Sequence, residues 1–276
     1  MGRVTSVPTI LLAQVEVEAD KRENLKKFGR AFAAARTSGA QLVVFPEVAL
    51  AYLPSTASNA ERWEAAESME GPAVREMREL AAHHGVWAVF GMYERPGEKD
   101  PLLRVYSSVA VVAPSGEVAG VYRKSHLYDA FGHKESEEYV PGNEIFNPIE
   151  TPFGRLGVLV CYELRFPEVA RTQALRGADL LAIPSAWYAG PLKEMHFELL
   201  VRARALENGI YAAACDQAGN GFVGRSLISD PLGVPIAVAS EQPDQFVLAS
   251  LERSRVESTR RTFPYRDQRR PDLYRS

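Results

Sequence analysis

The sequence is short of cysteine and of long apolar runs, and each shortage excludes a class of protein. Its 276 residues include only two cysteines, Cys161 and Cys215, and neither belongs to a CxxC pair. This argues against a disulfide framework and gives no sign of a zinc site. No apolar run reaches the roughly 18 to 20 residues that a membrane-spanning helix needs, and the first residues do not resemble a signal peptide. We therefore expect a soluble, reduced protein of the cytoplasm.

The sequence also lacks an excess of positive charge and the common cofactor motifs. Its 32 Lys and Arg and 35 Asp and Glu give a formal net charge of -3, whereas nucleic-acid binding needs surplus Lys and Arg to neutralise phosphates. The five histidines form no HExxH pattern, and the phosphate-binding patterns GxxxxGK and GxGxxG do not occur. We predict a protein that binds no nucleic acid, membrane or metal and acts without a cofactor on a small neutral or anionic molecule.

What the sequence does have is a high content of apolar residues, 46%, arranged in strand and helix patterns. The apolar run 9–15 predicts a strand. Apolar residues at helical spacing over 25–35 predict a helix that ends at Gly39, and the run 42–45 predicts a second strand. The same order returns later in the chain, with a predicted strand at 156–160, a helix at 167–176 and a strand at 180–183.

Both of these strand-helix-strand units contain the pattern G-A-x-L-x-x-x-P, at 39–46 and again at 177–184. The repetition favours a duplicated layout with one sheet in each half of the chain.

No linker divides the chain, so we expect residues 1–252 to form a single α/β domain. The Arg-rich tail, 253–276, cannot build a core of its own, and we expect it to contact the body or a partner subunit. The remaining predicted strands are 86–93, 106–113, 117–122, 210–214, 224–229, 234–238 and 246–251. Two more helices are predicted, one at 72–85 and one that ends at Gly209. The second carries Met195, Leu199, Arg202 and Leu206 on a single stripe.

Three reactive side chains follow predicted buried strands. Glu47 comes after the strand at 42–45, and low-dielectric surroundings would raise the pKa of its carboxyl group, which suits a general base. Cys161 comes directly after the strand at 156–160 and before a helix, where backbone N–H groups can face a developing oxyanion. Lys124 follows a third strand, and its ammonium group would stabilise a thiolate or an oxyanion.

Each of the three residues also has an ordinary structural interpretation. Glu47 would then be a solvated carboxylate at a strand end, Cys161 a buried core cysteine and Lys124 a surface lysine. Cys215 lies inside an apolar run, and we interpret it as a core residue. The combination of three such groups at strand ends favours catalysis for the set as a whole.

The segments around these residues resemble the three signatures of the nitrilase, or carbon-nitrogen hydrolase, superfamily. They are FPE at 45–47, YRKSHL at 122–127 and CYELRFPE at 161–168, in the family's order and at similar separations. The resemblance extends over nearly the whole chain. It implies an α/β fold with the four-layer αββα sandwich of the nitrilase type.

The resemblance also implies a Glu-Lys-Cys catalytic set. In that set Cys161 is the nucleophile, Glu47 is the general base, and Lys124 is the cation that stabilises the oxyanion. The backbone N–H of Tyr162 would be a second oxyanion donor.

Two further expectations come from the resemblance alone. The family carries another glutamate in its site, and Glu135 matches it best, with Glu137 and Glu138 as alternatives. The family also pairs its subunits across a helical interface. We therefore expect a homodimer or a larger homo-oligomer, with the tail 253–276 as a subunit contact.

The residues after the nucleophile distinguish the branches of the superfamily. Nitrilases resemble Cys-Trp-Glu and carbamoylases Cys-Asn-Asp-Arg-Arg, whereas CYELRF at 161–166 is similar to the amidase branch that includes omega-amidase and deaminated glutathione amidase. The resemblance implies release of ammonia from a small aliphatic or carboxylated primary amide through a thioester. The alternatives are an N-carbamoyl amino acid hydrolase, a nitrilase, or a non-catalytic binding protein. The loop 128–133 differs from that of either named amidase, and Asp216 stands where relatives often carry asparagine, so the substrate stays open.

Four residues are candidates for substrate binding. The planar guanidinium of Arg165 matches a substrate carboxylate with two parallel hydrogen bonds, or else it bonds to nearby loop carbonyls or to Glu168. Tyr52, Trp187 and Tyr188 follow strand ends, where they would line the pocket or serve as packing residues.

Overall fold

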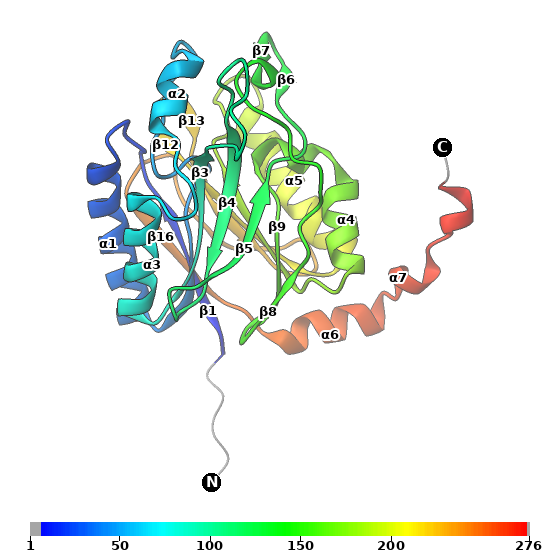
Figure 1. Ribbon diagram of the computed structural model, residues 1–276. Coiled ribbons are helices and arrows are strands. Elements are labelled where there is room, and N and C mark those ends of the chain that lie inside the picture. Colours follow the sequence, from blue (N-terminus) through cyan, green and yellow to red (C-terminus); the bar gives the residue numbers. More distant parts are fainter. Residues whose placement is uncertain (1–6, 275–276) are drawn as a thin grey trace.

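Two stacked β-sheets with helices on their outer faces form the body of the protein (Figure 1). The computed structural model describes residues 7–274, and within that range each large sheet has six strands. The first sheet has the order β16-β1-β2-β3-β4-β5, and the second has the order β15-β14-β11-β10-β9-β8. This arrangement confirms the predicted αββα sandwich.

The first sheet comes from the N-terminal half of the chain, with one exception. Its strand β16 comes from the C-terminal half and pairs antiparallel with β1, so the expected layout of one sheet in each half is confirmed apart from this strand. Helices α1 (Lys21–Ser38), α2 (Asn59–Ala65) and α3 (Pro72–His84) belong to this half. The strands are β1 (Thr9–Gln14), β2 (Ala40–Val44), β3 (Trp87–Glu94), β4 (Tyr106–Val112), β5 (Val118–Arg123) and β16 (Gln245–Ser250).

The second sheet carries helices α4 (Pro167–Leu175) and α5 (Lys193–Asn208). Its strands are β8 (Ile149–Thr151), β9 (Gly154–Val158), β10 (Leu180–Ser185), β11 (Tyr211–Asp216), β14 (Leu227–Ser229) and β15 (Pro235–Val238). Two small hairpins complete the body, one of β6 (Asp129–Ala130) and β7 (His133–Lys134), the other of β12 (Ala218–Gly219) and β13 (Phe222–Val223).

The central strands are largely apolar because both of their faces are buried. In β1, Ile10 and Leu12 belong to the core between the sheets, whereas Leu11 and Ala13 pack on the side of α1 and α3. Successive side chains of a strand point to opposite faces, so one short run supplies both layers. This explains why the runs predicted as strands show no polar alternation.

Helix α5 forms as predicted, but its apolar stripe does not face the core. The side chains of Met195, Leu199 and Leu206 are exposed by 53%, 57% and 53%. The residues that α5 buries, Phe197 and Val201 among them, lie on the opposite side. An apolar stripe on the solvent side of a helix is a feature of protein surfaces that bind a partner.

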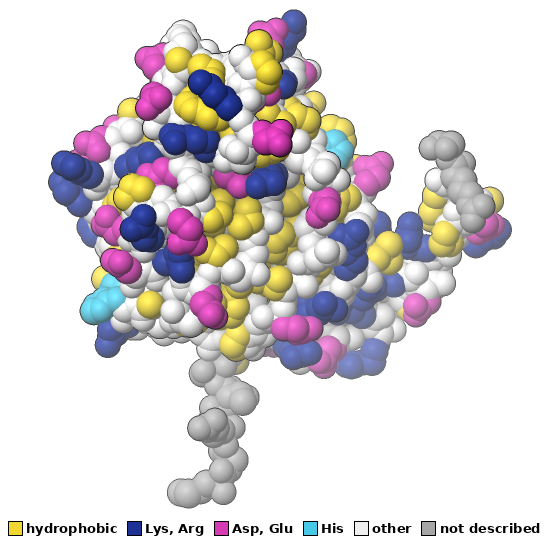
Figure 2. Space-filling view, in the orientation of Figure 1, with side chains coloured by type: hydrophobic (Ala, Val, Ile, Leu, Met, Phe, Trp, Pro, Cys, Tyr) yellow, Lys and Arg dark blue, Asp and Glu magenta, His cyan; other side chains and the backbone are white. Residues whose placement is uncertain are grey.

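The chain leaves the body through a basic tail made of α6 (Arg253–Thr262), α7 (Tyr265–Gln268) and a 3-10 turn at Pro271–Leu273. Helix α6 is attached to the body: Val256 is buried, and Arg260 lies 2.7 Å from Asp179. Beyond α6, Arg266 donates to the carbonyls of Ala174 and Leu175 in α4, and the rest of the tail projects past α4 (Figure 1), with dark-blue basic side chains gathered on it (Figure 2). Within residues 7–274, no helix combines the length and apolar character needed to cross a membrane.

Candidate active site

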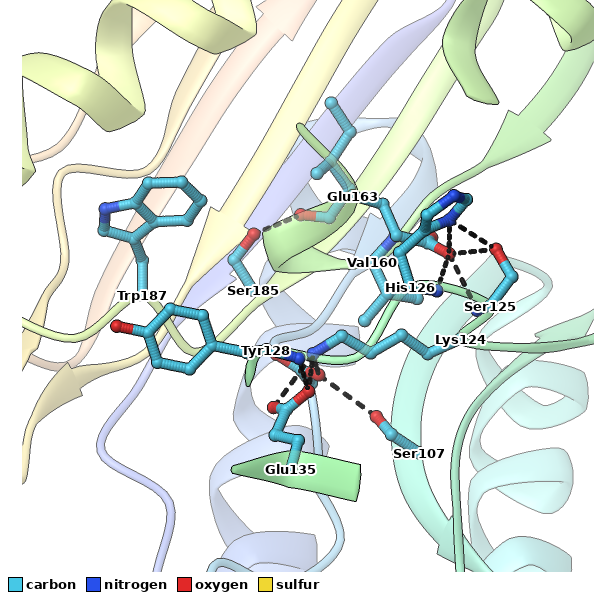
Figure 3. Close-up of polar contacts among 12 residues, drawn as sticks. Ser107, Lys124, Ser125, His126, Tyr128, Glu135, Val160, Glu163, Ser185 and Trp187 are labelled. Carbon is cyan, nitrogen blue, oxygen red and sulfur yellow. Dashed lines mark hydrogen bonds and ion pairs between the residues drawn. The ribbon is translucent and has the colours of Figure 1, made fainter. Parts of the chain in front are cut away.

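Glu47, Lys124 and Cys161 meet at the edge of the two sheets where β2, β5 and β9 end. The three side chains are buried, with residue exposures of 4%, 1% and 7%. Lys124 Nζ lies 2.9 Å from Glu47 Oε1. The surface-lysine interpretation of Lys124 and the solvated interpretation of Glu47 are therefore wrong. Figure 3 shows the Lys124 side chain running toward Glu135. Ser107, labelled in the same view, donates to the carboxylate of Glu47.

The position of Glu47 is fixed by both halves of the chain. Its backbone N–H donates to the Ser185 carbonyl at 3.2 Å, and Ser107 Oγ donates to its Oε1 at 3.1 Å. Gln217 Nε2 donates to the Glu47 carbonyl at 3.0 Å. A Cβ on Gly91 would lie 2.7 Å from Glu47 Cα, so a glycine is needed where β3 passes this segment. The carboxylate is thus held by elements that are distant in sequence.

Glu135 completes a carboxylate-lysine-carboxylate arrangement. Its Oε2 lies 2.8 Å from Lys124 Nζ and accepts the Tyr128 N–H at 2.7 Å. Of the three glutamates considered for this position, the structure brings Glu135 to the lysine. Glu137 lies 3.3 Å from Lys134 on the exposed hairpin, and Glu138 pairs with buried Arg62 at 3.0 Å.

Cys161 begins a 3-10 turn, Cys161–Arg165, and its backbone φ is +46°. A positive φ is uncommon for a residue other than glycine and marks a strained turn. The strand predicted at 156–160 ends at Val158, so the chain has room to turn before the cysteine. This turn places Cys161 at the edge of the core, where it also lines a cavity. Cys215 is fully buried within β11, as its core interpretation requires.

Burial and charge act against each other at the three side chains. Burial and the neighbouring Glu47 raise the pKa of the Cys161 thiol well above its usual value, although Lys124 lowers it. Burial also raises the pKa of Glu47, with Lys124 opposing and Glu135 adding to the rise. Burial would lower the pKa of Lys124, but Glu135, Glu47 and Cys161 outweigh it and raise that pKa. The lysine therefore stays charged, while Glu47 is suited to accept a proton.

Glu163 is a buried residue of this region whose role the sequence patterns did not indicate. Its Oε1 accepts from Tyr122 Oη at 2.7 Å and from Ser125 Oγ at 2.6 Å, and its Oε2 accepts from the Val160 N–H at 2.8 Å. Figure 3 shows this second set of contacts, with Ser125 and His126 around Glu163. The carboxylate thereby joins the turn of the cysteine to the segment that follows the lysine. In the sequence, the feature that could have pointed to Glu163 is its position in the CYELRFPE segment, two residues after Cys161.

A small cavity opens above Cys161. Trp187, Tyr188 and Tyr162 line it, and Trp187 also packs against Phe197 in the core. Tyr52 lines an adjoining cavity that shares Glu135, Ala186 and Tyr188 with the first one. The complete lining of the first cavity is Tyr128, Glu135, Cys161, Tyr162, Arg165, Ala186, Trp187, Tyr188 and Lys193.

Arg165 reaches this cavity without the partners that its structural interpretation requires. Its guanidinium carbon lies 5.0 Å from the centre of the Trp187 ring and 6.0 Å from that of Tyr162. Among residues 7–274, no hydrogen-bond partner is found for its buried Nε and Nη2 atoms. The predicted bonds to loop carbonyls or to Glu168 are therefore not made by these two atoms. A desolvated guanidinium with unused donors is suited to bind a carboxylate.

Asp216 supports the wall of the cavity. Its Oδ1 accepts the backbone N–H of Trp187 at 2.7 Å, and no partner for its Oδ2 is found in the described part of the chain. Burial raises the pKa of Asp216 well above its ordinary value, and the charge of Glu47 adds to this rise. The backbone N–H groups that donate to Asp216 act in the opposite direction but do not outweigh burial. A protonated Asp216 resembles asparagine in shape and charge. The same described residues contain no group of three or more His, Cys, Asp or Glu placed to hold a metal ion.

Comparisons with known proteins agree with this geometry. Residues 9–261 match the family model described as carbon-nitrogen hydrolase. The chain is 33% identical to the human deaminated glutathione amidase over 281 residues, which cover 97% of this chain and 84% of that protein. It is 43% identical to the deaminated glutathione amidase of Escherichia coli O157:H7 over 163 residues, 59% of this chain and 62% of that protein. A carbon-nitrogen hydrolase from Helicobacter pylori has a similar structure, with a TM-score of 0.88, 26% identity and coverage of 97% of each chain.

Proposed function

This chain belongs to the carbon-nitrogen hydrolase family, and from that premise we propose that it is a cysteine-dependent amidase that hydrolyses a small carboxylated or aliphatic amide at Cys161. The observation that carries the proposal is the buried ammonium group of Lys124 between the carboxylates of Glu47 and Glu135 and close to Cys161, with Glu135 and Cys161 lining the cavity. A charged lysine and a carboxyl group of raised pKa are costly to bury, and such groups are concentrated at catalytic sites.

In the first half of the reaction, the Cys161 thiol attacks the amide carbon while Glu47 takes the thiol proton. The carbonyl oxygen becomes an oxyanion, and Lys124 together with the Tyr162 N–H stabilises it. The carbon-nitrogen bond then breaks, the nitrogen leaves with the proton held by Glu47, and an acyl thioester remains on Cys161.

In the second half, Glu47 takes a proton from water, and the resulting hydroxide attacks the thioester carbon. The carbon-sulfur bond breaks, the carboxylic acid leaves, and the proton returns to Cys161. Glu135 touches no reacting atom in this scheme. Its role is to hold Lys124 charged and in place through the 2.8 Å contact.

The substrate class follows from Arg165. Its unused guanidinium donors, desolvated beside Trp187, favour an amide that bears a carboxylate. Two similar proteins carry the name deaminated glutathione amidase, which supports an amide over a nitrile or a carbamoyl group. The aromatic side chains of Trp187 and Tyr188 would pack on the carbon chain between the two polar ends.

Ammonia release tests the proposal on four compounds: a dicarboxylic acid monoamide, a neutral aliphatic amide, an N-carbamoyl amino acid and a nitrile. We expect the monoamide to be the best of the four and the Cys161→Ala variant to be inactive on all of them. Carbon dioxide released with the ammonia would instead identify a carbamoyl hydrolase. Turnover by Cys161→Ala equal to that of the wild type would contradict the assignment of the nucleophile.

We also propose that the protein is a homodimer or a larger homo-oligomer. The exposed apolar stripe of α5 and the basic tail that extends beyond the body are the surfaces that a second copy would cover.

A further inference from the structure

Lys193 lines the same cavity as Cys161 and Arg165, although no sequence pattern marks it. It is the first residue of α5, at the positive end of a 16-residue helix. Its Nζ lies 3.3 Å from Tyr128 Oη and 4.0 Å from the centre of the Phe131 ring. Within residues 7–274, its Nζ forms no ion pair with an aspartate or glutamate. The cation thus rests on aromatic side chains in place of a counter-ion.

A bound anion can replace these aromatic contacts of Lys193. An aromatic ring stabilises a cation only weakly, whereas a charge-assisted hydrogen bond to a carboxylate stabilises it more strongly. The ring of Phe131 is 75% exposed, so Lys193 lies at the outer end of the cavity. Arg165 lies over Trp187, which is 4% exposed, at a more enclosed position.

The charges of the cavity favour two negative groups on the substrate. Glu135, the acidic residue that lines the cavity, is already paired with Lys124. Arg165 and Lys193 are therefore two neighbouring cations without acidic partners, and they oppose each other's charge: burial and then Arg165 lower the pKa of Lys193. One bound carboxylate relieves one of the two cations and leaves the other unpaired.

We infer that Lys193 is a specificity-determining residue that binds a second carboxylate of the substrate, so that the preferred amide carries one carboxylate for Arg165 and another for Lys193. This inference rests on the proposed amidase function and adds the number and placement of the substrate's charges. It also gives a purpose to the hairpin of β6 and β7, which supplies the aromatic side chain that holds the cation when no substrate is bound.

The test compares amides that differ in the number of carboxylates. Propane-1,2,3-tricarboxylic acid monoamide and N-glutarylglycine carry two, glutaric acid monoamide carries one and pentanamide none. We expect the wild type to prefer one of the two dicarboxylates by tenfold or more in kcat/KM over the monocarboxylate. In Lys193→Met, kcat/KM for that dicarboxylate should fall at least tenfold further than kcat/KM for pentanamide, through an increase in KM. Lys193→Arg, which keeps the positive charge, should restore most of the preference.

Lys134→Met is the matched control, because Lys134 is an exposed cation of the same hairpin that pairs with Glu137. It should leave the preference for the dicarboxylate as it is. Equal losses on all substrates in Lys193→Met would show a structural role and overturn the inference, as would a wild type that turns over glutaric acid monoamide without preferring either dicarboxylate. Inactivity of the wild type on every amide would instead contradict the proposed function itself. Thermal unfolding of each variant confirms that the fold is intact.

Discussion

At the scale of single residues, the site is organised around one buried cation shared by two carboxylates. Lys124 is attracted to both Glu47 and Glu135, so each carboxylate changes how strongly the other is held. The charge of Glu135 also raises the pKa of Glu47 directly. The second glutamate therefore controls how readily the first one accepts a proton.

The Glu135→Gln variant should show this control in its pH dependence. Removing the charge lowers the pKa of Glu47, so the acidic limb of the kcat/KM profile should move to lower pH. A less basic Glu47 and a less firmly held Lys124 should reduce kcat by about 100-fold. The control is Glu137→Gln, on the same turn but paired only with exposed Lys134. An acidic limb that stays in place in Glu135→Gln would contradict the assigned roles.

Asp216 provides a second prediction, which concerns stability. Its pKa is raised in the folded protein, above all by burial and next by Glu47 among the charges, so folding favours its protonated form. The contribution of such a group to stability is full below the pKa of the unfolded chain and is lost as the pH rises toward the folded value. Asp216→Asn keeps the acceptor for the Trp187 N–H and cannot ionise. The difference in Tm between this variant and the wild type should therefore be more positive at pH 8 than at pH 5.

Differential scanning calorimetry at the two pH values measures this difference. Asp216→Leu, which removes the acceptor for the Trp187 N–H, is the comparison variant and should lower Tm at both pH values. A Tm difference for Asp216→Asn that is the same at pH 5 and pH 8 would show that Asp216 is ionised in the folded protein.

At the scale of elements, Glu163 connects the two segments that carry the nucleophile and the lysine. Burial alone would raise its pKa, but hydrogen bonds from His126, Ser125, Tyr122 and Val160 outweigh burial and lower it. Because the pKa of Glu163 is lowered by folding, its carboxylate stabilises the fold at pH values above the pKa of the unfolded chain. This stabilisation is lost as the pH falls through the lower pKa of the folded protein. The 3-10 turn of Cys161 is thereby fastened to the end of β5.

We predict that Glu163→Gln reduces the free energy of unfolding at neutral pH by about 3 kcal/mol, because an amide cannot accept all the donors that surround the carboxylate. Urea denaturation at pH 7.5 measures the loss, and kcat should fall with it since the cysteine turn is loosened. Glu168→Gln, at the exposed start of α4, is the control and should change stability by less than about 0.5 kcal/mol. Equal stability of the two variants would rule out the fastening role.

The same scale shows which parts of the molecule could be predicted from the sequence. Strands buried on both faces appear as continuous apolar runs, and Gly39 and Gly85 end helices because they adopt positive φ values of 72° and 67°. These local signals gave the elements and their order. They also placed Glu47 and Cys161 at strand ends.

Contacts between distant segments left no such signal. Lys193 follows a loop and reaches the cavity only because α5 packs beside the turn of Cys161, and Arg165 is unpaired only in the context of the assembled site. The stripe of Met195, Leu199 and Leu206 has the spacing of a core face yet is exposed. Periodicity shows that a helix has an apolar face, but it does not show whether that face packs inside the subunit or against another one.

At the scale of the whole molecule, that stripe and the tail predict how copies of the chain associate. A side of α5 with Leu199 and Leu206 more than half exposed is costly in water, and a C2 dimer would bury the same stripe from both copies. Sedimentation velocity of the wild type should therefore give at least twice the chain mass of 30.5 kDa. Leu199→Glu places a charge within the stripe and should shift the protein toward the monomer, because burying an unpaired carboxylate is unfavourable. Leu102→Glu changes a leucine that is 63% exposed elsewhere on the surface, and it should leave the sedimentation coefficient as it is. A wild type that sediments as a monomer at micromolar concentration would show that the stripe serves another purpose.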